Sequence, residues 1–96
     1  MMTGRASRDA VARWNVAYAE QTAALFAASR PQPVDLDAIR RLSRAYAEVA
    51  GAWRVLAAEL AIPLWARHAA VVAAEEFERR AGMEVLRVQQ SEGSGQ

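Results

Sequence analysis

Along three stretches of the chain, apolar residues recur every three or four positions among polar ones, which is the spacing of an amphipathic helix. The first stretch follows Ser7, a good N-cap residue, and carries Asp9 in its first turn, where a negative charge suits the helix dipole. These signals predict a first helix over residues 8–28. The positions that share the helical spacing are Val11, Trp14, Tyr18, Thr22, Leu25 and Phe26.

The second stretch has the most regular pattern. Pro31 and Pro33 end the first helix, and Asp35 is a good N-cap for a second helix predicted over residues 36–62. Over three heptads, its apolar residues are separated alternately by three and four positions. They are Ile39, Leu42, Tyr46, Val49, Trp53, Leu56 and Leu60. Small residues flank this heptad where a two-stranded coiled coil carries charges, so the pattern favours a helical bundle.

Pro63 interrupts the pattern, because it has no N–H to donate to the carbonyl of Glu59. We expect a kink or a corner there. The helical spacing then resumes and predicts a third helix over residues 64–81, with Gly82 as its C-terminal stop. Val85 and Val88 keep the same phase, so an extension of this helix to residue 88 is the alternative. Residues 91–96 are predicted to form a flexible tail.

These elements predict an all-α fold, with one helical domain over residues 1–90. The turn between the first two helices is short, which favours an antiparallel helical hairpin or a three-helix bundle. From Val49 to Ile62 the second helix is apolar on nearly every side, and such a helix is usually buried on every side. A chain of 96 residues has few helices to cover it. We therefore expect a homodimer or higher oligomer, with an interface containing Trp53, Val55, Leu56, Ile62 and Trp65.

Composition narrows the function. Ala accounts for 23 of the 96 residues and is the strongest helix former. The net charge of +1 lacks the basic excess of nucleic-acid binders, so we expect no nucleic-acid partner. All 12 basic residues are Arg, which we interpret as the codon usage of a GC-rich bacterial genome.

The chain contains no Cys, which excludes disulfides and thiol chemistry. Its N-terminus lacks the apolar run of a signal peptide. The most apolar window of 20 residues, 55–74, includes Glu59, Arg67 and His68, and charges at mid-membrane are costly. We therefore expect a cytoplasmic protein without a transmembrane segment.

No motif in the sequence indicates chemistry. His68 is the only histidine, and no Glu-x-x-His pair of the kind found in carboxylate-bridged metal bundles is present. Ser7, Ser29 and Ser43 have no neighbouring His or Lys to act as a base. We therefore predict no enzymatic activity, no cofactor and no metal site.

Three arginines, Arg40, Arg41 and Arg44, cluster near the start of the predicted second helix. One interpretation is a docking patch for an acidic partner, a phosphate or an anionic surface. The other is a solvated face whose charges are offset by Asp35, Asp37 and Glu48.

The sequence therefore favours a small non-catalytic helical interaction protein. Such a protein would self-associate or act as an accessory or scaffold subunit of a larger assembly. One alternative is an amphipathic coat protein of phasin type on a lipid or storage-granule surface, since Ala-rich helices with Trp and Arg suit that role. A ligand carrier with a pocket between its helices is a further alternative.

Overall fold

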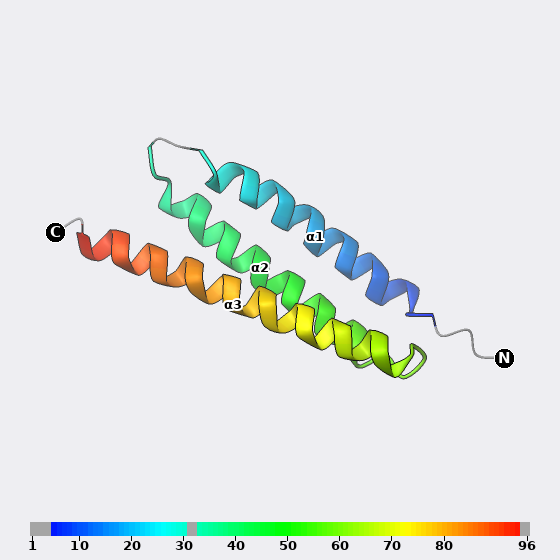
Figure 1. The fold of residues 1–96 in the computed structure, drawn as a ribbon. Helices are drawn as coiled ribbons and strands as arrows, with labels where there is room; N and C mark the ends of the chain where they lie inside the picture. Colours follow the sequence, from blue (N-terminus) through cyan, green and yellow to red (C-terminus); the bar gives the residue numbers. More distant parts are fainter. Residues whose placement is uncertain (1–4, 31–32, 95–96) are drawn as a thin grey trace.

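The computed structural model describes residues 5–30 and 33–94, and three helices account for most of them. They are α1 (Arg8–Ala28), α2 (Leu36–Ala57) and α3 (Leu64–Ser94). Each helix runs antiparallel to the one before it, and α2 lies between α1 and α3 (Figure 1). No strand occurs in the described part of the chain, so the predicted all-α fold and three-helix bundle are confirmed.

The first two helices begin where their caps predict. The Ser7 Oγ accepts a hydrogen bond from the Ala10 N–H at 3.1 Å, and the Asp35 Oδ1 accepts one from the Ala38 N–H at 3.0 Å. Each bond satisfies an N–H that has no partner within its helix. The range of α1 agrees with the prediction, while Pro31 lies outside the described residues.

The prediction that the second helix continues to residue 62 is wrong, because α2 ends at Ala57. The N–H of Glu59 bonds to the carbonyl of Leu56 at 3.1 Å, which tightens the last turn. The Arg67 side chain donates from its Nε to the carbonyl of Ala57 at 3.0 Å and so caps the end of α2. Pro63 stands directly before α3, and its carbonyl accepts the first bonds of that helix.

The third helix is longer than predicted, since α3 continues through Gly82 and ends at Ser94. Nothing lies within 4 Å of the position that a Gly82 side chain would occupy, so the helix passes this residue without obstruction. Val88 is buried, and an Arg40–Glu92 ion pair joins the last turns of α3 to the start of α2. The predicted tail is therefore helical over residues 91–94, and residues 95–96 lie outside the described part.

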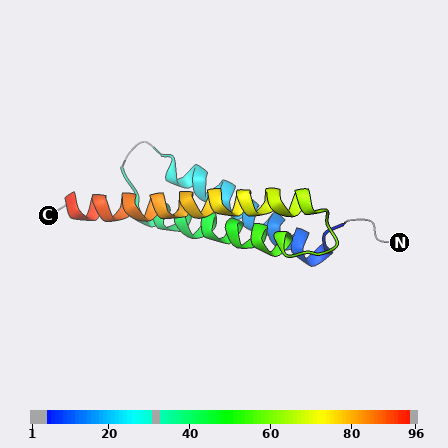
Figure 2. The ribbon, with the colours of Figure 1, turned by 60° about the horizontal axis from the view of Figure 1, so that its bottom comes forward.

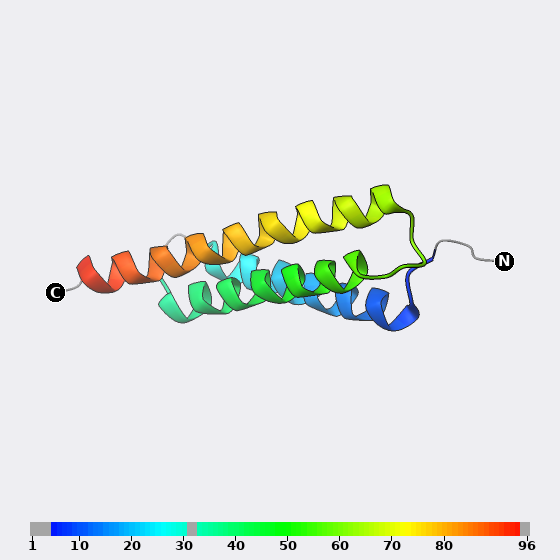
Figure 3. The ribbon, with the colours of Figure 1, turned by 90° about the horizontal axis from the view of Figure 1, so that it is seen from below.

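The bundle is a narrow rod of 61 × 19 × 15 Å between Cα atoms, with α3 lying along α2 over most of its length (Figures 2 and 3). Among the described residues, no Cα of α1 lies within 8 Å of a Cα of α3. The backbones of both outer helices are therefore closest to α2, while the core clusters combine side chains from all three helices. Most of the buried apolar residues in the described part of the chain are alanines, and the large side chains that are fully buried there are Ile39, Leu42 and Val49, all on α2.

The two ends of the heptad on α2 differ in burial. Its first four members, from Ile39 to Val49, are buried, whereas Trp53 and Leu56 are half-buried. Leu60 is 82% exposed, because it follows the end of α2 and no longer shares its face. The heptad thus predicts the core correctly over its first four residues, from Ile39 to Val49.

This difference gives a test of the fold. Leu42→Ala should lower the free energy of unfolding by about 2–5 kcal/mol, because it leaves a cavity in the core. Leu60→Ala should change that free energy by less than about 0.5 kcal/mol, because the side chain is exposed. Urea denaturation followed by circular dichroism measures both. Equal losses in the two variants would show that α2 continues through Leu60 as the heptad suggests.

Candidate interaction surface

The residues predicted as an interface do not form one exposed patch. Trp53, Val55, Leu56 and Ile62 are each half-buried within the single chain, because the 58–63 turn brings α3 back along α2. Trp65 is different, since it is 75% exposed at the start of α3. A partner would therefore find much less free apolar surface on the first four residues than on the fifth.

Aromatic side chains gather where α1 meets α2. The ring of Trp14 stacks on Tyr18 with centroids 4.8 Å apart, and it meets Trp53 edge-on at 5.3 Å. Both indole N–H groups, of Trp14 and of Trp53, are buried without a hydrogen-bond acceptor among the described residues. The four-residue spacing of Trp14 and Tyr18 could have indicated their contact from sequence, whereas the contact with Trp53 depends on the register of two helices.

A second aromatic pair joins α2 to α3. Tyr46 and Phe77 lie 5.9 Å apart between ring centroids. The guanidinium of Arg80 covers this pair, 4.9 Å from the Phe77 centroid and 6.0 Å from that of Tyr46. Burial raises the pKa of Tyr46, and the nearby Glu84 carboxylate raises it further. Arg80 therefore covers the apolar contact between Tyr46 and Phe77.

The three clustered arginines have different surroundings. Arg41 forms two hydrogen bonds to the carboxylate of Glu20 on α1, at 2.7 and 2.9 Å. Arg40 bonds to Asp37 and to Glu92. Arg44 is exposed and lies with Arg40 beside a shallow groove of about 350 Å³ between α2 and α3. Two of the three arginines thus use their charge to join helices, which leaves Arg44 with the freest guanidinium of the cluster.

Other ion pairs also cross between helices or reinforce one helix. Arg54 on α2 holds Glu78 on α3 through two hydrogen bonds of 2.6 and 2.7 Å. These bonds lower the pKa of Glu78, just as those of Arg41 lower the pKa of Glu20. Within α3, hydrogen bonds from Arg79 and Arg80 lower the pKa of Glu76 to about 2.

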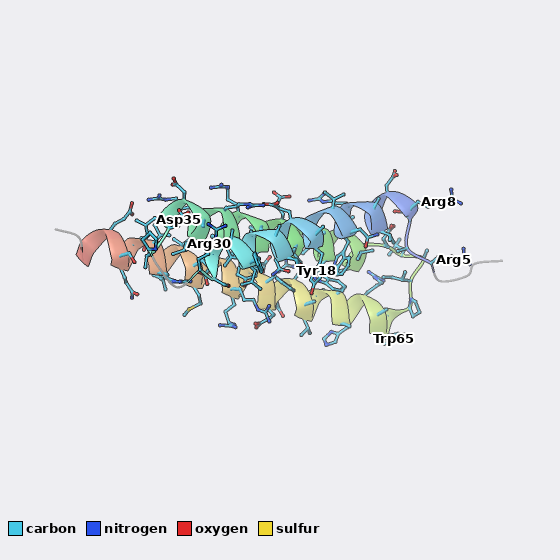
Figure 4. The ribbon with its side chains drawn as sticks, turned by 90° about the horizontal axis from the view of Figure 1, so that it is seen from above. Arg5, Arg8, Tyr18, Arg30, Asp35 and Trp65 are labelled. Atoms are coloured by element: carbon cyan, nitrogen blue, oxygen red, sulfur yellow. The ribbon has the colours of Figure 1, made fainter. Side chains whose placement is uncertain are left out.

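One flank of α1 is apolar and lies beside the face that packs on α2. Val11, Tyr18 and Leu25 are seven residues apart, so they share this flank. The opposite flank of α1 contains Glu20, which bonds to Arg41, and Arg13, whose Nη2 lies 3.2 Å from the position of a Cβ at Gly51. That opposite flank contacts the side of α2 that lies away from α3. The apolar flank is therefore the one turned toward α3. Figure 4 shows Tyr18 midway along the bundle.

Exposed apolar side chains also occur elsewhere. Those at the α2–α3 turn are Leu60, Leu64 and Trp65, and those further along α3 are Val72, Met83, Val85 and Leu86. Val16, Phe26 and Val34 are exposed on or after α1. Exposed apolar side chains indicate an interaction site where they are contiguous, and Leu60, Leu64 and Trp65 lie close together in the sequence.

A metal-ligand cluster and a membrane-spanning helix are both missing from the part of the chain that the structure describes. Over residues 5–30 and 33–94, no three His, Asp or Glu side chains come close enough together to hold a metal ion. No helix in these ranges combines the length and the apolar character needed to cross a membrane. Comparison of the chain with protein-family models, with curated proteins and with solved structures found no match.

The ion pairs between helices predict acid sensitivity. Because Glu20 and Glu78 have pKa values below the ordinary 4.5, their pairs stabilise the fold above that pH and lose this effect as pH falls through the lowered values. The melting temperature should therefore decrease from about pH 4.5 downward. Glu20→Gln with Glu78→Gln should lower the melting temperature at pH 7 and flatten its pH dependence. An unchanged acid dependence in this double variant would assign the effect to other carboxylates.

Proposed function

We propose that this chain is a small non-catalytic interaction protein that self-associates through the side of the bundle between α1 and α3. The observation that carries the proposal is the apolar flank of α1, which is formed by Val11, Tyr18 and Leu25. This flank is turned toward α3, but no Cα of α1 lies within 8 Å of a Cα of α3 among the described residues. Two helices that both pack on a third leave a side that a fourth helix can cover.

The size of the core supports a need for further burial. Ile39, Leu42 and Val49 are the large side chains that are fully buried, while each residue on the apolar flank of α1 remains about 42% exposed. Apolar surface gains about 25 cal/mol for each Å² removed from water. A second copy placed antiparallel on this side would cover the same flank in both molecules, as two-fold symmetry requires.

We propose the apolar flank of α1 as the main contact, in place of the interface that the sequence predicted. Val55, Leu56 and Ile62 are half-buried already, so they offer a partner less surface than the flank of α1. As an accessory or scaffold subunit, the protein would use the same flank toward a larger partner. The absence of Cys and the use of Arg without Lys support the proposal of a bacterial cytoplasmic protein.

The proposed interface is tested by a matched pair of variants on α1. Tyr18→Glu with Leu25→Glu should convert the oligomer into a monomer in sedimentation analysis at tens of micromolar. Val16→Glu with Phe26→Glu adds the same charges on the same helix, at positions that are 71% and 80% exposed and lie outside this flank. This control should keep the wild-type mass.

Two results would contradict the proposal. One is a wild-type protein that is monomeric at this concentration. The other is a Tyr18→Glu, Leu25→Glu variant that folds, as judged by circular dichroism, and keeps the wild-type mass. Loss of the oligomer in the Val16→Glu, Phe26→Glu control alone would assign the interface to the outer side of α1 instead.

We further propose that Pro63 acts as the corner between α2 and α3. Proline restricts the unfolded chain, and at a compatible position it adds about 0.4–1 kcal/mol of stability. Pro63 is exposed and immediately precedes α3, so Pro63→Ala should lower the free energy of unfolding by that amount without changing the oligomeric state. Urea denaturation and sedimentation measure the two quantities, and no change in either would make the proline dispensable.

A further inference from the structure

The α2–α3 turn forms an apolar tip at one end of the rod. Leu60 is 82%, Leu64 76% and Trp65 75% exposed, and Pro63 between them is exposed as well. The six residues from Leu60 to Trp65 carry no charge. Figure 4 shows Trp65 at this end of the molecule.

The fold does not need these exposed side chains. The turn is closed by other groups, namely the Arg67 bond to the carbonyl of Ala57 and the bonds that the Pro63 carbonyl accepts from the first turn of α3. Ala61 and Ile62 supply its half-buried apolar contacts. Leu60, Leu64 and Trp65 therefore remain available to bind something outside the chain.

Basic side chains surround the tip. The N–H of Ser7 donates to the Glu59 carboxylate at 2.9 Å, which places the start of α1 against the turn. Arg5 and Arg8 are both exposed at this end (Figure 4). On α3, the half-buried Arg67 and the exposed His68 follow the tip within one turn.

The acidic groups at this end are fewer. Asp9 lies in the first turn of α1, and the carboxylate of Glu59 is already engaged by Ser7. In the part of the chain that the structure describes, this end therefore has three arginines, of which Arg67 also bonds to the Ala57 carbonyl, against the two carboxylates of Asp9 and Glu59. This arrangement complements a surface that is apolar inside and negatively charged at its edge.

We propose that this tip inserts into the interface of an anionic lipid membrane, with the rod standing on the bilayer. Tryptophan favours the boundary between headgroups and acyl chains, and leucines beside it would enter the acyl region. Arginines at the rim would contact lipid phosphates and the anionic headgroups. The inference does not depend on self-association, because the flank between α1 and α3 remains free when the tip is inserted.

The geometry favours a membrane over a second copy of the chain at this end. The cross-section of the rod is 19 × 15 Å between Cα atoms, and a stable protein–protein interface buries about 800 Å² on each partner. The Cα outline of the end encloses much less than this area. A bilayer requires no matching surface, since a few apolar side chains can enter it from a convex tip.

The tip can be tested by vesicle co-sedimentation with intrinsic tryptophan fluorescence. The wild-type protein should bind vesicles of phosphatidylcholine with phosphatidylserine, and the emission of Trp65 should shift to the blue. Trp65→Phe should abolish that shift, because the indoles of Trp14 and Trp53 already have buried N–H groups. Vesicles of phosphatidylcholine alone should bind less, since they lack net negative charge.

Two double variants separate the tip from general stickiness. Leu60→Asn with Leu64→Asn should weaken binding at least about tenfold, which corresponds to 1.4 kcal/mol. Phe26→Asn with Val34→Asn removes residues that are 80% and 58% exposed near the opposite end, and should bind as the wild type does. Both variants should melt as the wild type does, because the altered side chains are exposed.

The proposal is overturned if the wild-type protein does not bind anionic vesicles. It is also overturned if the Leu60→Asn, Leu64→Asn variant binds like the wild type, or if the Phe26→Asn, Val34→Asn control loses as much binding. A tip that contacts a protein instead would give the first of these results. Arg5→Gln with Arg8→Gln should reduce binding to anionic vesicles, and unchanged binding would remove the basic rim from the mechanism.

Discussion

The fold depends on the close packing of alanine faces against the central helix. Nine of the fourteen buried apolar residues in the described part of the chain are alanines, and they come from all three helices. Small side chains let helix backbones come near each other, but each contributes little apolar area. Apart from Val88, which is buried, the larger apolar residues described outside α2 consequently lie at the edges of these contacts or on the surface. The exposed flank of α1 and the apolar tip both follow from this division of small and large residues.

Local signals were sufficient to predict much of the fold. The caps at Ser7 and Asp35 bond only to residues three positions away, so the sequence around each cap contains the needed information. The first half of the heptad likewise predicts the buried face of α2. The two errors occur where distant residues decide the outcome. Arg67 caps α2 from ten residues away, and the start of α2 holds the last turns of α3 through Arg40 and Glu92.

The candidate surface was harder to predict for the same reason. The heptad and the apolar residues after it suggested an uncovered far side of the second helix, but α3 returns along that helix and half-buries Val55, Leu56 and Ile62. The arginine cluster was ambiguous from sequence because two of its three carboxylate partners, Glu20 and Glu92, are distant, while Asp37 is a local partner of Arg40. Glu20 is 21 positions from Arg41, and Glu92 is 52 positions from Arg40. Of the five residues predicted as an interface, Trp65 is the most exposed, because it lies at the start of α3.

In the described residues, α2 lies between α1 and α3, whose Cα atoms stay more than 8 Å apart. This arrangement also sets the order in which the helices open locally. The contact of α2 with α3 is more extensive than its contact with α1. Removal of α1 breaks its contact with α2 and leaves the α2–α3 hairpin paired. Such a molecule has two cooperative units of different stability. Amide protons of α1 would then exchange with solvent before those of α2, and this small rod would unfold from one side.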